Sequence, residues 1–197
     1  MSAPMANSDA SSDADVVQMM RTWLERAVIG LNLCPFAKAV HVKGQVHYAV
    51  CRARDVEGLR EALIHELNEL LAQDPSVRDT TLLIAPDMLA DFLDFNDFLA
   101  QADDALAELD LEGVVQIASF HPHYQFGGTA ADDITNYTNR APYPTLHLLR
   151  EESVDRAVAA FPEAEAIFER NMQTLEDLGH AGWQALGLDA APGPTQP

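Results

Sequence analysis

The sequence predicts an α/β protein, with a mixed α+β arrangement as the alternative, built on a small mixed sheet of about four strands packed by helices. Apolar residues recur at helical spacing in several segments, and short apolar or alternating runs between them predict strands. The helices between the first three strands are long enough for parallel crossovers, which are almost always right-handed. A two-layer ferredoxin-like sandwich and a three-layer arrangement both satisfy this order.

The length of 197 residues fits one domain with tails. We expect residues 1–13 to be a disordered N-terminal tail, residues 14–186 to form a single globular domain, and residues 187–197 to be a flexible C-terminal tail. The N-terminus has neither the basic start nor the apolar stretch of a signal peptide, and no apolar run approaches a membrane span. The expected location is therefore the cytoplasm, where Cys34 and Cys51 would be free thiols.

The first expected helix covers residues 15–33, because Val16, Met20, Trp23 and Ala27 recur on one face. It ends before Pro35, since the residue that precedes a proline disfavours helical geometry. Residues 46–53 alternate as in a strand. Asp55 is the expected N-cap of a second helix that carries four leucines on one face.

Residues 80–85 (TTLLIA) are a continuous apolar run, as expected of a central strand covered on both faces. A third helix follows Pro86, and residues 114–119 (VVQIAS) and 145–149 (TLHLL) predict two further strands, of which the last could pair antiparallel with its predecessor. Two helices close the chain. Ser153 is the expected cap of the first, and Pro162 and Gly179 are the expected start and C-cap of the second.

Twelve basic and 31 acidic residues give a net charge of −19. Such a surface repels phosphate backbones and anionic headgroups, so we expect no nucleic-acid partner and no membrane association. The sequence does not indicate an oligomeric state. Because basic residues are few, an arginine in a neutral segment is conspicuous, and Arg140 in NYTNRAPYP is such a residue.

The connection between the last two strands is the leading candidate for a functional site. It exceeds about 15 residues, which is usual for functional or disordered segments, and it is too aromatic for disorder. The end of this segment supplies Asn136, Asn139, Arg140 and Tyr143, and its start supplies Tyr124. Because a guanidinium binds carboxylate or phosphate through two parallel hydrogen bonds, these five residues predict binding of an anionic small molecule. A structural ion pair of Arg140 is the alternative.

Cys34, at the end of the first helix, is a candidate nucleophile. A thiol reacts as thiolate, and a helix C-terminus disfavours that charge, so catalysis would need a cation or base from elsewhere in the chain. A small buried residue is the alternative reading of Cys34.

His121 and His123 form an H-x-H pattern at a strand end, and His147 lies on the next strand. Residues two apart in an extended chain point to the same side, so the pair could meet one metal ion with His147 as a third ligand. Ordinary hydrogen-bonded histidines are the alternative. The sequence identifies neither a metal nor a cofactor.

Four motifs together resemble a bacterial family catalogued only as a domain of unknown function, number 1415. They are WLERAVIGLNLCPFAKAV (23–40), LDFNDFL (93–99), SFHPHYQF (119–126) and NYTNRAPYPTLHLLRE (136–151). The resemblance covers about residues 22–186 and implies no activity, cofactor or mechanism. In the family pattern the position of His123 often holds Asp, which weakens the H-x-H metal reading and leaves His121 and His147 as the better histidines.

Three functions stay open from the sequence. The first is an enzyme in which Cys34, His121 and His147 act on an anionic substrate held by Arg140. The second is a metal-binding protein that uses His121, His147 and an acidic residue. The third is a non-catalytic ligand-binding or interaction module. The sequence does not decide whether the protein is an enzyme, and we favour the first reading.

Overall fold

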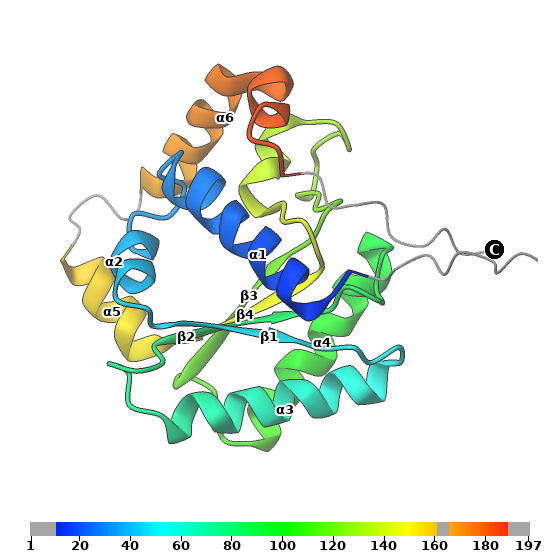
Figure 1. Cartoon of the computed structure of the whole chain (residues 1–197), viewed down its shortest axis with the longest axis vertical. Coiled ribbons are helices and arrows are strands. Elements are labelled where there is room, and N and C mark those ends of the chain that lie inside the picture. Colours follow the sequence, from blue (N-terminus) through cyan, green and yellow to red (C-terminus); the bar gives the residue numbers. More distant parts are fainter. Residues whose placement is uncertain (1–10, 161–165, 189–197) are drawn as a thin grey trace, which may run out of the picture.

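A computed structural model describes residues 11–160 and 166–188 of the chain. Helices and strands alternate through most of it (Figure 1). The elements in chain order are α1 (Asp13–Trp23), the π-helix η1 (Leu24–Ile29), α2 (Ala37–Val42), β1 (Val46–Val50), α3 (Val56–Ala72), β2 (Thr80–Ile84), α4 (Phe92–Glu108), β3 (Val115–Phe120), the 3-10 helix η2 (Ile134–Asn139), β4 (Thr145–Arg150), α5 (Glu151–Ala159) and α6 (Ile167–Gln184).

The four strands form one mixed sheet in the order β1-β2-β4-β3. β1 and β2 are parallel, and β4 lies antiparallel between β2 and β3. The central strand β2 is buried along its whole length, as its continuous apolar run predicts. The register places His147 of β4 opposite Leu82 of β2 and Ala118 of β3.

Helices cover both faces of the sheet, so the three-layer alternative is the one observed (Figure 1). Side chains alternate between the faces along each strand, and β2 therefore contributes to two cores. Leu83 packs with α3 and α4 on one face, whereas Leu82 and Ile84 pack with α1, η1 and α6 on the other. The predicted mixed α/β class is thereby confirmed.

Side-chain caps fix the start of three of the α-helices. Asp55 accepts a hydrogen bond from the backbone of Gly58 and caps α3, as the sequence predicts. Asp91 caps α4 in the same way, and Ser12 forms a capping box with Asp15 at the start of α1. The first helix therefore begins at Asp13, with its cap fixed by Ser12.

The last two helices differ in detail from the expectation. α5 begins at Glu151, directly after β4, so Ser153 lies inside it and is not its cap. Gly179 adopts a φ of 63°, but the chain resumes helical geometry after it and α6 continues to Gln184. Pro162 lies outside the described residues. Two six-residue helices, α2 and η2, were not predicted, because one or two turns show no clear periodicity.

Within residues 11–160 and 166–188, no helix is long and apolar enough to cross a membrane.

Candidate functional site

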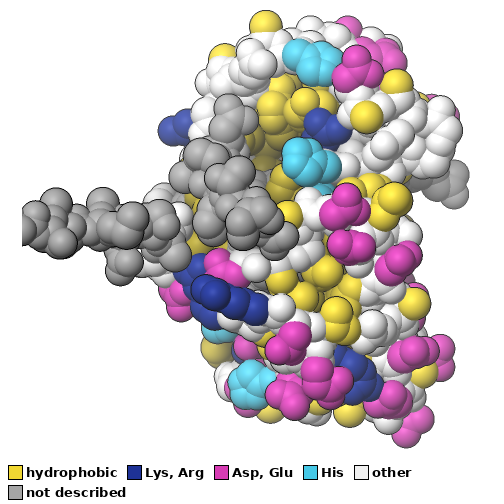
Figure 2. All heavy atoms as spheres, turned by 90° about the vertical axis from the view of Figure 1, so that its right-hand side faces the viewer, with side chains coloured by type: hydrophobic (Ala, Val, Ile, Leu, Met, Phe, Trp, Pro, Cys, Tyr) yellow, Lys and Arg dark blue, Asp and Glu magenta, His cyan; other side chains and the backbone are white. Residues whose placement is uncertain are grey.

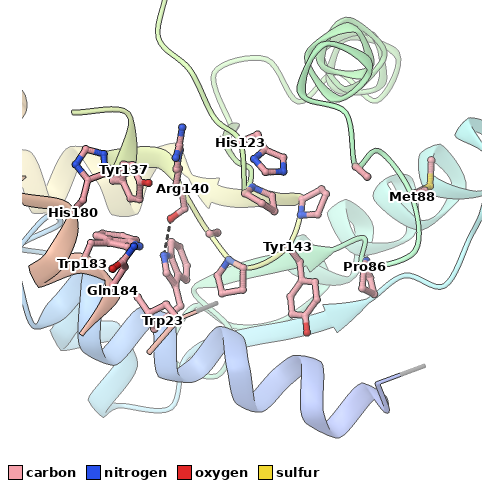
Figure 3. A pocket seen from close by; sticks show the side chains of 16 residues that line it. Trp23, Pro86, Met88, His123, Tyr137, Arg140, Tyr143, His180, Trp183 and Gln184 are labelled. Carbon is pink, nitrogen blue, oxygen red and sulfur yellow. Dashed lines mark hydrogen bonds between the residues drawn. The ribbon is translucent and has the colours of Figure 1, made fainter. Parts of the chain in front are cut away.

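A cavity of about 580 Å³ lies beyond the carboxyl ends of β2 and β3 (Figure 3). Open α/β sheets bind ligands at this edge, and the volume is in the range of small-molecule sites. The segments that follow β2 and β3 and the segment that precedes β4 form part of the wall. Residues of α1, η2 and α6, with Leu188 after α6, form the remainder. The lining residues are Trp23, Pro86, Met88, Ala90, Pro122, His123, Tyr137, Arg140, Ala141, Pro142, Tyr143, Pro144, His180, Trp183, Gln184 and Leu188.

Asn136 holds together the first half of the long connection between β3 and β4. Its side chain is fully buried, and its Oδ1 accepts hydrogen bonds from the backbone N–H of Phe126 and the hydroxyl of Thr129. Its Nδ2 donates to the carbonyl of Ala130 at 2.8 Å. Asn139 donates to the carbonyl of Ser119, which ties η2 to the end of β3. Both asparagines therefore bond to the backbone of the connection and position the cavity wall.

Arg140 lines the cavity directly after η2. Its Nε donates to the carbonyl of Tyr124 at 3.2 Å, and one Nη2 hydrogen donates to the carbonyl of Ala131 at 2.6 Å. The guanidinium carbon lies 4.2 Å from the ring centroid of Tyr137, an arrangement that cation–π attraction favours. These contacts hold the side chain in place and use two of its five N–H donors.

Arg140 has no carboxylate partner within the part of the chain that the structure describes. Four other arginines do pair with carboxylates in the same part: Arg52, Arg60, Arg78 and Arg156. The predicted alternative, a structural ion pair of Arg140, is thus not seen in residues 11–160 and 166–188. Three N–H groups on the two terminal nitrogens remain for an oxyanion that approaches end-on.

Aromatic side chains give the cavity an apolar floor. The indole Nε1 of Trp23 donates to the carbonyl of Arg140 at 2.9 Å, the dashed line in Figure 3. Tyr137 meets Trp183 edge-to-face at 4.9 Å between ring centroids, and His180 at 5.6 Å. His180 and Trp183 reach the cavity because α6 resumes after Gly179. Such a floor favours a ligand with an apolar or planar part.

His121 is fully buried, and the two residues that follow it, Pro122 and His123, line the cavity. Its Nδ1 accepts a hydrogen bond from the backbone N–H of His123 at 2.9 Å, so its Nε2 carries the proton and donates to the carbonyl of Leu89 at 2.9 Å. Leu89 has a φ of 54°, which is uncommon for a bulky residue, and this bond helps to hold it there. Burial lowers the pKa of His121 to about 4.

His147 lies in β4, on the sheet face that packs against α1 and α6. Its Nε2 is 2.7 Å from the hydroxyl of Thr80, which itself donates to the carbonyl of Leu148. Nε2 of His147 must therefore be the donor in this pair. Burial lowers the pKa of His147 to about 4. The hydrogen bond to Thr80 and the lowered pKa are typical of a neutral histidine in a protein core.

Cys34 follows η1 and packs against the core that contains α1 and α6. Burial raises the pKa of its thiol, more than the hydrogen bonds from the backbone of Phe36 and Ala37 lower it. A thiol of raised pKa is a poor nucleophile at neutral pH. Cys34 is not among the residues that line the cavity.

Tyr124 and Tyr143 differ in their position at the site. Tyr143 lines the cavity, and burial raises the pKa of its hydroxyl. Tyr124 presents its carbonyl to Arg140, and its ring packs against Phe92 and Phe126. Tyr124 therefore supports the site from behind.

No group of three or more His, Cys, Asp or Glu side chains in residues 11–160 and 166–188 is arranged to hold a metal ion. Both ring nitrogens of His121 are engaged in hydrogen bonds to the fold. The residues of the cavity fit an organic anion better than a cation, because Arg140 is their fixed charge.

Figure 2 shows the face toward which β1 points in Figure 1. Hydrophobic side chains gather there beside basic and histidine side chains, with acidic side chains around them. On a chain of net charge −19, these basic and histidine side chains offer a favourable position for an anion.

Of the eight residues expected at a site, the cavity brings together Arg140 and Tyr143, with Tyr124, Asn136 and Asn139 as their support. Cys34, His121 and His147 do not line it, and their catalytic roles stay predictions. Lining residues that sequence analysis did not assign to a site include Trp23, His180 and Trp183, and it considered His123 only as a metal ligand. Trp23 belongs to the apolar face of its helix, and the spacing of that face does not show whether a residue on it packs in the core or lines a cavity. The available signal was that Trp23 and Trp183 are the two tryptophans of the chain.

Residues 15–185 match the model of a family described as "Protein of unknown function (DUF1415)". Neither the curated proteins nor the solved structures contain a match to the chain.

Proposed function

Because the chain belongs to this DUF1415 family, whose description names no reaction, we propose a function from the cavity alone: the protein binds a small organic anion there, and Arg140 holds the anionic group. One observation carries the proposal. Arg140 lines the cavity, and no carboxylate neutralises it within the described residues.

The chemistry of the wall sets the kind of anion. Four prolines line the cavity and present no backbone N–H: Pro86, Pro122, Pro142 and Pro144. An anion therefore finds few competing donors there, and the guanidinium is the strongest of them. The apolar floor of Trp23 and Trp183 favours an aromatic or aliphatic body on the ligand. An organic acid or phosphate ester combines both parts.

An enzyme that acts on this anion is the further step of the proposal. The enzyme hypothesis assigns chemical roles to Cys34, His121 and His147 from their residue types alone. A binding protein without catalysis needs only the cavity residues, so binding is the part that the geometry supports best.

Tryptophan fluorescence tests binding directly, because both tryptophans of the chain line the cavity. We would titrate the protein with benzoate and with benzamide, its neutral analogue of similar shape. The expected result is a saturable change in emission with benzoate and at least tenfold weaker binding of benzamide, about the value of one charge-assisted hydrogen-bonded pair.

Arg140→Gln should abolish the preference for benzoate, and Arg140→Lys should keep part of it, because the charge remains but the fork is lost. Arg60→Gln is the matched control, since Arg60 pairs with Glu108 and does not line the cavity. Circular dichroism and thermal unfolding would verify that each variant folds. An absence of binding to any small anion, or an unchanged benzoate affinity in folded Arg140→Gln, would contradict the proposal.

A further inference from the structure

His123 is the lining histidine that has no hydrogen bond at either ring nitrogen within the described residues. In the described part of the chain its ring nitrogens have no hydrogen bond or ion pair, whereas the other cavity histidine, His180, contacts the carbonyl of Asp132 at 2.8 Å. The ring of His121 is 5.9 Å away between centroids, and both its nitrogens are engaged elsewhere. A polar ring at a cavity wall without a structural partner is a candidate ligand contact.

The backbone holds His123 firmly in place. Its N–H donates to Nδ1 of the buried His121, and Pro122 fixes the preceding dihedral angle. His121 is itself tied down, because its N–H donates to the carbonyl of Asn139 and its carbonyl accepts from the N–H of Tyr124. Groups that bind a ligand well are held by such a supporting shell.

The same short segment connects His123 to Arg140. The guanidinium donates to the carbonyl of Tyr124, the residue that directly follows His123. Adjacent Cα atoms are about 3.8 Å apart, so this bond anchors the cation close to the backbone of the histidine. Both side chains line the cavity, and Figure 3 shows them on the same rim of the hollow.

We infer that His123 is a specificity-determining residue of the anion site and selects anions with three terminal oxygens, the phosphonate, phosphate-ester and sulfonate class, over carboxylates. This inference rests on the proposed function. Arg140 has three N–H groups left on its terminal nitrogens, and two of them satisfy two oxygens end-on. A carboxylate has no further oxygen to offer, whereas a three-oxygen group presents its third oxygen to the ring N–H of His123.

Benzenesulfonate and benzoate provide the test, because both carry one negative charge on the same ring and differ in the number of oxygens. At pH 7, the tryptophan fluorescence titration should give about tenfold tighter binding of benzenesulfonate, the increment expected for one hydrogen bond to a charged group. Phenylphosphonate should bind at least as tightly. His123→Gln should weaken binding of benzenesulfonate and leave the benzoate affinity within about twofold, since its contact is with the third oxygen alone.

His65→Gln is the matched control, because His65 is exposed on α3 and does not line the cavity. His123→Asn is the second variant, since it also shortens the side chain and should lose the sulfonate preference in the same way. Equal affinity for the two anions in the natural protein, or equal losses for both in His123→Gln, would overturn the inference while the anion site stands. No binding of any of the anions would instead refute the site itself.

Discussion

Acidification from pH 7 to pH 5 should destabilise the protein through His147. The hydroxyl of Thr80 donates to the carbonyl of Leu148 and accepts from Nε2 of His147, which fixes the neutral tautomer of the ring. A second proton would go to Nδ1, which has no hydrogen-bond partner among the described residues. His147 retains some exposure to solvent. Burial nevertheless lowers its pKa to about 4, against about 6.5 in an unfolded chain.

Proton linkage gives the sign and the size of this change in the free energy of unfolding. Between pH 4 and pH 6.5 the unfolded chain binds a proton that the folded protein does not, so the free energy of unfolding falls as the pH falls through this window. With the two pKa values above, His147 should remove about 2 kcal/mol between pH 7 and pH 5, or about 1 kcal/mol if its surroundings relax on protonation. His121, whose pKa is also about 4, adds to the same effect.

Urea unfolding at the two pH values measures this contribution by difference. His147→Gln keeps a donor for Thr80 and cannot titrate, so its free energy of unfolding should fall by about 1–2 kcal/mol less than that of the natural protein. The 31 acidic residues contribute equally to both proteins and cancel. His65→Gln, at an exposed position of α3, should behave as the natural protein. A pH effect of the same size in His147→Gln and in the natural protein would refute the reasoning.

Two further predictions concern the support of the cavity and the predicted nucleophile. Asn136→Ala removes three hydrogen bonds of a fully buried side chain and leaves the backbone N–H of Phe126 without its acceptor, so it should lower the free energy of unfolding by about 2–4 kcal/mol, measured by urea unfolding. Asn68→Ala, which removes one exposed bond on α3, should change it by less than about 0.5 kcal/mol. Burial raises the pKa of Cys34, so mass spectrometry should show its alkylation by iodoacetamide at pH 7.5 to be far slower in the native protein than in urea. Rapid native labelling would restore the case for a nucleophile.

The sequence predicts those parts of the fold that depend on local pattern. The continuous apolar run of β2 predicts a central strand, and Asp55 predicts the start of α3. The position of β4 between β2 and β3 depends on pairing between segments more than 60 residues apart, which no local pattern encodes. The start of α5 at Glu151 is missed because the strand passes into the helix without a capping side chain.

The candidate site also has residues that the sequence indicates and residues that only the folded structure reveals. Arg140 is conspicuous in the sequence because it is a rare cation in a neutral segment, and the structure places it at the cavity. The chemistry of a histidine depends on its partners, and partners are not visible in a sequence. His121 and His147 are held by the fold, whereas the ring of His123 faces the cavity. Trp183 reaches the cavity only because α6 continues beyond Gly179.

The strand order also has a consequence for synthesis on the ribosome. Chains grow from the N-terminus, so β1, β2 and β3 emerge before β4. Until residue 150 has been made, β2 has one open edge and β3 has no neighbour at all, since β4 is its partner in the sheet. Open edges pair readily with other chains. A nascent chain halted before Thr145 therefore exposes strand edges that the finished sheet covers, and completion of the sheet depends on β4, the last of its four strands in chain order.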